Sequence, residues 1–243
     1  MGTATFYIDN LTFLDYIRLM ARIARAVAPG YPHHVTQRGN YQQNIFKDEE
    51  DYHRYKGWLE EYSRKEGLKI WAYCLMTNHV HFVCVPESDT SLSRTFNTVH
   101  MRYAQYFNKK QGVKGHLWQG RFCSSILDDN HLYAAIRYIE NNPLRAAMVA
   151  EAKEYPWSSA RGHIEVSSDP LLSYDSPLDT EIKDWEVYLR EAYDENLVES
   201  IRKNGLTGRP CGDDGFISKL EDILDRELKS KPRGRPWPSK GEI

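Results

Sequence analysis

The chain of 243 residues lacks several features that would place it outside the ordinary globular proteins. No run of about 18 apolar residues occurs, which excludes a helix that spans a membrane. The four cysteines are scattered and form no Cys-x-x-Cys pair, so we expect reduced thiols and a cytoplasmic protein. Hydrophobic residues make up 41% of the chain and charged residues 27%, which permits a core and argues against wholesale disorder.

An excess of positive charge is also missing, because the formal net charge is −2. The charges are nevertheless unevenly spread: the segment 91–127 has basic residues and no acidic ones, the segment 165–200 is mostly acidic, and the tail 228–241 is basic again. A positive patch suits a phosphate backbone, although a solvated surface produces the same pattern. The candidate phosphate-binding residues are Arg94, Arg102, Lys109, Lys110, Lys114 and Arg121, with Arg233 and Arg235 in the tail.

Composition divides the chain into three regions. Residues 1–30 are expected to form an N-terminal extension, and Met20 begins a more ordinary protein start, so residues 1–19 are interpreted as an upstream extension of the reading frame. Residues 31–164 are expected to form one domain. Residues 165–243 are expected to form a helical C-terminal region with a basic tail, reached through the Ser-, Pro- and Asp-rich segment 167–177.

The order of the expected elements indicates an α+β fold. Strands are expected at 31–37, 68–75, 79–85 and 122–127, the second and third of them as a hairpin. Helices are expected at 48–64, 92–107 and 129–141 from apolar residues at spacings of three and four, with two more at 185–204 and 216–228. Strand, helix, hairpin, helix, strand is the order of a ferredoxin-like sandwich with an antiparallel sheet.

Two histidines stand at the start of one expected strand. Side chains alternate across a strand, so His79 and His81 share one face while Val80 and Phe82 enter the other. Two imidazoles on one face can bind one divalent metal if another element supplies a third ligand. Two unrelated polar residues on a half-exposed strand would give the same pattern.

A tyrosine and an asparagine follow in the helix expected at 129–141. Tyr138 lies about a third of a turn away from the apolar stripe, and Asn142 is one turn further on the same face. Such a tyrosine is usually a surface aromatic. It can also present a phenol beside a ligand amide, where a metal that polarises a phosphate would make attack by the phenol practicable.

Three motifs in this order resemble the REP-associated tyrosine transposases, within the HUH nucleases that act on single-stranded DNA with one catalytic tyrosine. They are Asn78-His79-Val80-His81-Phe82, Leu117-Trp118-Gln119-Gly120-Arg121-Phe122 and Tyr138-Ile139-Glu140-Asn141-Asn142-Pro143-Leu144-Arg145-Ala146. The resemblance extends from about residue 31 to about residue 164.

The resemblance implies an enzyme and assigns roles to the motif residues. His79 and His81 would bind the metal, Asn142 would be a third ligand, and Tyr138 would be the nucleophile that forms a 5′-phosphotyrosine link. A neutral ligand set with open positions suits Mg²⁺ or Mn²⁺. The implied substrates are single-stranded or hairpin DNA at repeated palindromes, handled by a monomer rather than a dimer, with strand transfer following cleavage.

Other interpretations stay open at this point. The chain could be a catalytically inactive, domesticated protein that binds DNA hairpins, or a hydrolase in which the histidines and water release product without an adduct. A zinc site with Cys74 or Cys84 is a further alternative, although Cys84 faces away from the histidines on an alternating strand. Trp118 and Phe122 could stack on bases, but core positions are favoured. The tail around Arg233 and Arg235 resembles an AT-hook, and a basic tail that contacts phosphates is an equal alternative.

Overall fold

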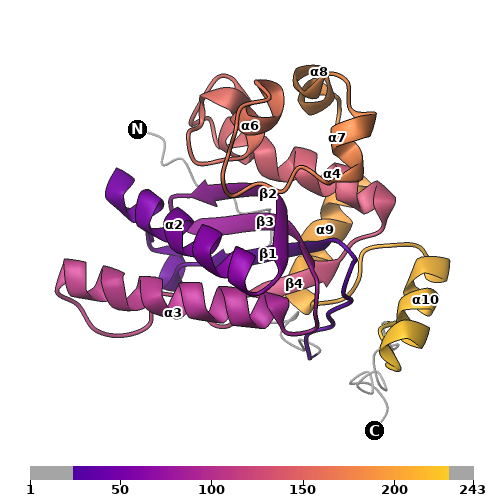
Figure 1. Cartoon of the computed structure of the whole chain (residues 1–243), viewed down its shortest axis with the longest axis horizontal. Helices are drawn as coiled ribbons and strands as arrows, with labels where there is room; N and C mark the ends of the chain where they lie inside the picture. Colours follow the sequence, from indigo (N-terminus) through magenta and orange to yellow (C-terminus); the bar gives the residue numbers. More distant parts are fainter. Residues whose placement is uncertain (1–23, 230–243) are drawn as a thin grey trace, which may run out of the picture.

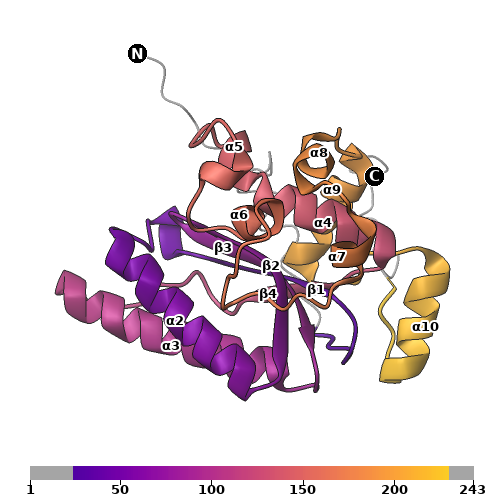
Figure 2. The ribbon, with the colours of Figure 1, turned by 45° about the horizontal axis from the view of Figure 1, so that its top comes forward.

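The computed structural model describes residues 24–229 and shows a four-stranded antiparallel sheet covered by helices on both faces. The strands are β1 (His33–Arg38), β2 (Leu68–Met76), β3 (His79–Pro86) and β4 (Cys123–Ile126), in the spatial order β2-β3-β1-β4. Figure 2 shows α2 and α3 below the strands and α4, α6 and α9 above them. The strand order and the antiparallel pairing confirm the predicted ferredoxin-like core.

The two helices of the lower layer lie side by side and match the sequence expectation closely (Figure 1). Helix α2 (Glu49–Lys65) begins where the side chain of Asp48 accepts a hydrogen bond from the amide of Asp51, as expected for an N-cap. Helix α3 (Ser91–Gln111) is longer than predicted at its C-terminus and ends at Gly112, which has φ +65. A glycine there stops the helix, because a left-handed conformation costs it little.

The hairpin of β2 and β3 gives the sheet two different faces. Val80, Phe82 and Cys84 of β3 enter the core formed with α2 and α3. Val83 and Val85 enter the second core, on the opposite face. The predicted alternation of β3 is therefore confirmed, and it places the side chains of odd-numbered residues under the upper layer of helices.

Helix α4 (Asp129–Glu140) is the main element of that upper layer. Its apolar residues pack against Val83 and the neighbouring strand residues, and Asp128 caps it by accepting from the amide of His131. The chain then continues directly into the short helix α5 (Asn142–Arg145), in which Pro143 occupies the first turn. The helix predicted to continue to Asn141 thus ends one residue earlier, and Asn142 starts a new helix.

The C-terminal helices form the rest of the upper layer, except α10, which packs with residues 24–30 in a separate cluster. They are α6 (Ala160–Ile164), α7 (Pro177–Glu181), α8 (Trp185–Arg190), α9 (Glu195–Thr207) and α10 (Asp214–Leu224), with the 3-10 turns η1 (Asn40–Gln42) and η2 (Ala152–Glu154) elsewhere in the chain. The single helix predicted at 185–204 is wrong, because the chain breaks into α8 and α9. Asp194 caps α9 through its side chain and so ends any continuous helix before it.

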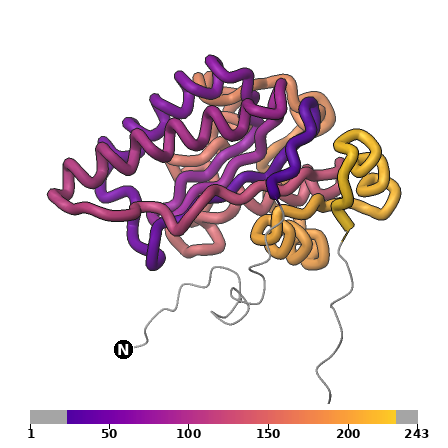
Figure 3. The backbone as a smooth tube through the Cα atoms, turned by 90° about the horizontal axis from the view of Figure 1, so that it is seen from below, coloured from indigo at the N-terminus to yellow at the C-terminus, as the bar shows by residue number. Residues whose placement is uncertain are grey.

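Two irregular segments pack onto the core. The segment 167–177, expected to be a linker, runs along β2: the Ser173 amide donates to the Ile70 carbonyl at 2.8 Å, and the Trp71 indole donates to Asp175 at 2.9 Å. Residues 24–30 pack beside α10, where Ala26 and Ala28 are buried. Seen from below, α10 lies at one end of the molecule, away from α2 and α3 (Figure 3).

Within residues 24–229, none of the helices combines the length and apolar character that a membrane crossing requires.

Candidate active site

The two histidines of β3 lie under the upper helical layer, on the face shared with α4. His79 and His81 are each only 8% exposed, and their rings are 4.9 Å apart between centroids. The antiparallel register of β1 against β3 places His34 on the same face. Its Nε2 lies 3.0 Å from Nδ1 of His81, and the two rings are stacked with an interplanar angle of 3°.

Hydrogen bonds fix both rings through the same nitrogen. Nδ1 of His79 pairs with Oδ1 of Asn78 at 2.6 Å, and Nδ1 of His81 pairs with His34. This turns Nε2 of His79 toward Asn142, whose Nδ2 lies 3.4 Å away. Holding one ring nitrogen while the other faces a site is the usual arrangement for a metal-binding histidine.

Burial keeps these imidazoles neutral. It lowers the pKa of His79 to about 3, with a smaller contribution from the charges of Arg38 and Arg145. It also lowers the pKa of His81 well below its ordinary value, and the pKa of His34 to about 4. A neutral imidazole retains the lone pair that a metal ion needs, so the electrostatics suit a ligand pair at neutral pH.

Helix α4 brings Tyr138 to the histidines. The Tyr138 ring meets the His81 ring edge to face, with 5.9 Å between centroids and an angle of 87°. Tyr138 is only 2% exposed, so its offset from the apolar stripe does not place it at the surface. Two guanidinium groups flank the ring: that of Arg145 is 3.9 Å from its centroid and that of Arg202, from α9, is 5.4 Å away.

Asn142 completes the group from the first residue of α5. It is 8% exposed, and its Oδ1 accepts a hydrogen bond from Arg145 at 3.1 Å. The preceding residue is also fixed, because Nδ2 of Asn141 donates to the Leu189 carbonyl at 2.7 Å. Hydrogen bonds therefore fix both residues that precede Pro143.

The donor set fits a divalent cation of the Mg²⁺ or Mn²⁺ type. His79 and His81 lie together on β3, and Asn142 faces His79 through Nδ2 while its Oδ1 accepts from Arg145. The Asn142 amide would have to rotate to present its oxygen to a metal beside the histidines. No group of three His, Cys, Asp or Glu side chains in the described part of the chain is arranged to hold a metal. Cys84 lies in the opposite core, and no such group includes Cys74, so a thiolate zinc site has no support among the described residues.

Four of the eight predicted phosphate-binding residues lie away from this group. Arg94, Arg102, Lys109 and Lys110 belong to α3, in the layer on the other face of the sheet. Lys110 is bound to Asp48 and Asp51, each at 2.8 Å, and Arg102 donates to the Tyr62 hydroxyl at 2.6 Å. Sequence proximity to the motifs therefore does not translate into spatial proximity for α3. Arg233 and Arg235 lie outside the described residues.

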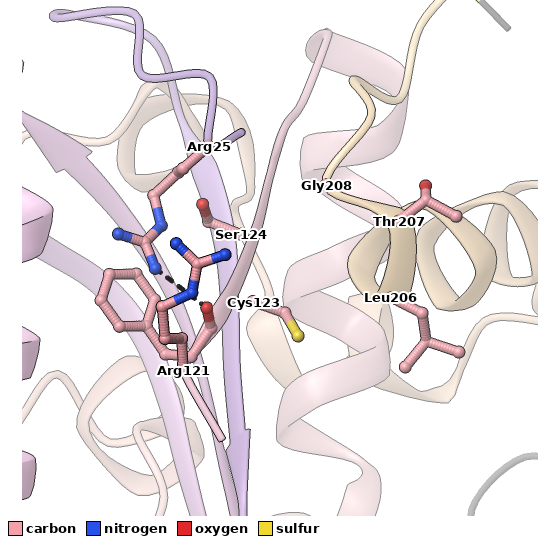
Figure 4. A pocket seen from close by; sticks show the side chains of 8 residues that line it. Arg25, Arg121, Cys123, Ser124, Leu206, Thr207 and Gly208 are labelled. Carbon is pink, nitrogen blue, oxygen red and sulfur yellow. Dashed lines mark hydrogen bonds between the residues drawn. The ribbon is translucent and has the colours of Figure 1, made fainter. Parts of the chain in front are cut away.

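Arg121 instead lines a small pocket at the edge of β4. Figure 4 shows it beside Arg25 and Ser124, with Leu206 and Thr207 of α9 on the opposite wall. The Arg25 guanidinium lies 3.5 Å from the Phe122 ring centroid and donates to the Phe122 carbonyl at 3.0 Å. Lys114 is exposed in the loop that leads to this strand. Unlike the basic residues of α3, Lys114 and Arg121 lie in the segment 112–121, which packs against the end of β1.

The aromatic residues of this segment belong to the core, as the sequence favoured. Phe122 is 3% exposed, and the indole of Trp118 donates to the His100 carbonyl at 2.9 Å while its ring packs on the His100 ring at 4.6 Å. Three residues around the site had not been assigned roles: His34, Arg145 and Arg202. His34 is revealed only by the register of β1 against β3, and Arg202 only by the packing of α9 against the sheet.

Comparisons with known proteins agree with the motifs. Residues 29–142 match the family model described as "Transposase IS200 like". A protein of Haemophilus influenzae named "Putative REP-associated tyrosine transposase" is 26% identical over 110 residues, which cover 41% of this chain and 62% of that protein. A solved REP-associated tyrosine transposase bound to a REP hairpin covers 64% of this chain and 93% of its own, with a TM-score of 0.49 and 19% identity.

Proposed function

We propose that the chain, whose residues 29–142 match the IS200-like transposase model, is a metal-dependent endonuclease and strand transferase for single-stranded DNA. The reaction would take place at hairpin-forming palindromic repeats, as the name of the Haemophilus influenzae relative suggests. The expected intermediate is a 5′-phosphotyrosine link through Tyr138.

One observation carries the proposal: the phenol of Tyr138 lies beside the imidazole pair of β3 within a positively charged setting. The Tyr138 ring contacts His81, and the guanidinium groups of Arg145 and Arg202 lie on it. A scissile phosphate carries negative charge that grows during in-line attack, so fixed positive groups favour its binding and the transition state. A solely structural tyrosine has no need of two cations and a histidine pair.

The residues of the chain have separable tasks in this reaction. The Tyr138 oxygen attacks phosphorus, the bond from phosphorus to the 3′ oxygen breaks, and the leaving 3′ oxygen ends as a hydroxyl after taking up a proton. The phenol gives up a proton in the same overall step. Arg145 would hold both the ring of Tyr138 and the amide of Asn142, since it contacts each of them. Attack by another 3′-hydroxyl reverses the reaction and joins strands.

A bound Mg²⁺ or Mn²⁺ at His79, His81 and Asn142 would polarise a phosphate oxygen and offset the charge of the phosphate. Asn78 and His34 would keep the two imidazoles in the orientation and tautomer that this binding requires.

We propose that the enzyme acts as a monomer, as the resemblance to the REP-associated transposases implies. His79, His81, Tyr138 and Asn142 already converge without a residue from a second copy. We infer that Lys114 and Arg121 contact the DNA near this site. The cations of α3 and of the tail would then contact parts of the DNA further away, such as a hairpin stem, through phosphates.

The test incubates the protein with end-labelled hairpin DNA that carries single-stranded flanks, together with Mg²⁺ or Mn²⁺, and separates the products on a denaturing gel. We expect a covalent protein–DNA adduct and a free 3′-hydroxyl end. Tyr138→Phe, which removes one oxygen, should abolish both products while hairpin binding stays within about twofold, and excess EDTA should stop the wild type.

The same gel separates the alternatives. Cleavage without an adduct in the wild type would favour a hydrolase that uses water. Binding without cleavage under any metal would favour a DNA-binding protein that has lost its chemistry. An adduct formed at the normal rate by Tyr138→Phe would assign the nucleophile to another residue.

A further inference from the structure

The most exposed large aromatic side chain among the described residues is Tyr41, with 92% of its surface accessible. It lies in the short loop of residues 39–43, which follows β1 and contains the turn η1; we refer to these five residues as the Tyr41 loop. A single exposed ring is common on protein surfaces and by itself indicates nothing. Three further observations about the Tyr41 loop indicate that this ring binds a ligand.

First, the backbone of the Tyr41 loop is held in an unfavourable conformation. Tyr41 has φ 50 and Gln42 has φ 60, so two consecutive residues other than glycine occupy the left-handed region. Bulky side chains are rare there, and such conformations persist where the surroundings enforce them, often at functional sites. Gly39 supplies part of this constraint, because a Cβ at that position would lie 2.4 Å from the Gln43 carbonyl oxygen.

Second, hydrogen bonds fasten the Tyr41 loop to the motif that contains the metal-binding histidines. The Gly39 amide donates to the Asn78 carbonyl at 2.9 Å, and Nδ2 of Asn78 donates to the Gln42 carbonyl at 3.2 Å. The other end of the same Asn78 amide pairs with Nδ1 of His79 at 2.6 Å. One side chain therefore joins the loop to a proposed metal ligand.

Third, the surroundings of the Tyr41 loop are positive. The Asn40 amide and the Gln43 side chain both donate to the Leu117 carbonyl, at 2.7 and 3.2 Å. Leu117 belongs to the segment 112–121, which contains Lys114 and Arg121 and has no acidic residue. On the other side the loop follows Arg38, whose charge acts on His79.

We propose that Tyr41 is a stacking platform for one unpaired base of the DNA strand beside the scissile phosphate. An aromatic ring within a positive groove is the usual means of holding single-stranded nucleic acid. A single ring offers too little area to dock a protein, but it covers the whole face of one base. The inference rests on the proposed function, and it names a contact that lies outside the reacting group.

The matched variants are Tyr41→Asn and Tyr41→Trp. Asparagine tolerates the left-handed conformation, so Tyr41→Asn removes the ring while the loop is kept. Tyr41→Trp retains a ring. Tyr174→Ala is the control, because Tyr174 is a second exposed tyrosine, 49% accessible, on the segment that runs along β2.

Binding is measured in the Tyr138→Phe background, in which no adduct should form, with hairpin DNA whose single-stranded flank carries one abasic site at each position in turn. We expect Tyr41→Asn to weaken binding about tenfold, within the range for loss of one stacked base. Tyr41→Trp and Tyr174→Ala should stay within about twofold. At one flank position, removal of the base should weaken binding to the protein with Tyr41 as much as Tyr41→Asn weakens binding to intact DNA. Tyr41→Asn combined with that abasic DNA should show no further loss of affinity.

Two results would overturn the inference. One is equal DNA affinity for Tyr41→Asn and the protein with Tyr41; the other is that the affinity losses from Tyr41→Asn and from the abasic site add at every flank position. Neither is compatible with a base stacked on Tyr41. Failure of the proposed function looks different. Suppose that the protein with Tyr138 intact forms no adduct with any metal, while the losses from Tyr41→Asn and from one abasic site still fail to add. That result would contradict cleavage and would still support Tyr41 as a stacking platform.

Discussion

At the scale of single residues, His34 is the group on which the orientation of His81 depends. Its Nε2 holds Nδ1 of His81 at 3.0 Å inside the core. We expect His34→Leu to weaken Mn²⁺ binding by about 10- to 100-fold, as is typical when the hydrogen-bond partner of a metal ligand is removed. His34→Gln, which can still form that hydrogen bond, should lose less.

Calorimetric titration of Mn²⁺ into the DNA-free protein measures this difference directly. The matched control is His116→Leu, since His116 is exposed. Equal affinities for His34→Leu and the wild type would contradict the role of His34.

Arg202 gives a second prediction at this scale. Its guanidinium lies 5.4 Å from the Tyr138 ring centroid, and a cation at this distance stabilises a ring by about 0.5–2 kcal/mol. Arg202→Met should slow single-turnover adduct formation about tenfold at saturating DNA, with an unchanged dissociation constant, and Arg202→Lys should recover part of the rate. Lys203→Met on the same helix, where Lys203 is exposed, should match the wild type. A loss confined to DNA affinity would show that Arg202 contacts substrate alone.

These residues also show how far sequence reasoning reaches. The shared face of His79 and His81 follows from strand alternation, and the structure confirms it. His34 could not be placed, because its proximity to His81 depends on the register between β1 and β3, which no local pattern encodes. Arg202 could not be placed either, since only tertiary packing returns α9 to Tyr138.

At the scale of elements, the Tyr41 loop depends on the absence of a side chain at Gly39. The φ of Gly39 is −63, an ordinary value, so the requirement for glycine is steric and not conformational. In Gly39→Ala the added carbon would meet the Gln43 carbonyl oxygen at 2.4 Å and the Ile45 side chain at 2.8 Å. Backbone cannot yield as a flexible side chain does, so we expect a loss of about 1–3 kcal/mol in the free energy of unfolding. Urea unfolding followed by tryptophan fluorescence measures it.

Gly57→Ala is the matched control for that substitution. Gly57 lies within α2, and no atom lies within 4 Å of a Cβ built there, so alanine should be neutral or stabilising. If Gly39→Ala were as stable as the wild type, the tight approach of Gly39 to Gln43 would not limit the loop.

Element boundaries were predictable where capping and periodicity agree. Asp48 and the apolar spacing located α2 to within one residue, and the apolar spacing alone located the start of α4, which Asp128 caps in the structure. The break between α8 and α9 was not predicted, because the apolar residues on both sides of Asp194 keep a helical spacing. In the structure Asp194 caps α9. In the sequence, an aspartate in the middle of a helix cannot be told from an aspartate that caps the start of one. Tertiary packing determines which of the two forms.

At the scale of the whole molecule, buried neutral histidines predict a loss of stability in mild acid. Burial lowers the pKa of His33 and His34 to about 4 and that of His79 and His100 to about 3. Below pH 6.5 the unfolded chain takes up protons that the folded chain refuses, so the free energy of unfolding falls as the pH falls. Each such histidine should cost about 1.4 kcal/mol per pH unit between about 6 and 4.

Urea unfolding at pH 7.5 and pH 5.5 tests this expectation. His163 opposes the trend: although burial acts against it, the nearby Glu140 carboxylate raises its pKa, so the His163–Glu140 pair stabilises the fold below pH 6.5 and loses that contribution at higher pH. His100→Phe should reduce the pH dependence by about 1.4 kcal/mol over this interval. A flat profile in the wild type would contradict the prediction.

The return of α9 to the sheet has a consequence during synthesis of the protein. His34 leaves the ribosome early, whereas Arg202 and Gly205, which lies against His34, leave it much later. At about 5–20 residues per second, many seconds separate the first strand from the helix that covers it. Until then the face of Val83 and Ala72 has only part of its cover, because the second core also needs residues of α8 and α9 in addition to those of α4. A nascent chain stalled near the end of the matched segment therefore displays an incompletely covered apolar surface that a chaperone could recognise. The proposed site is complete only once synthesis has passed α9.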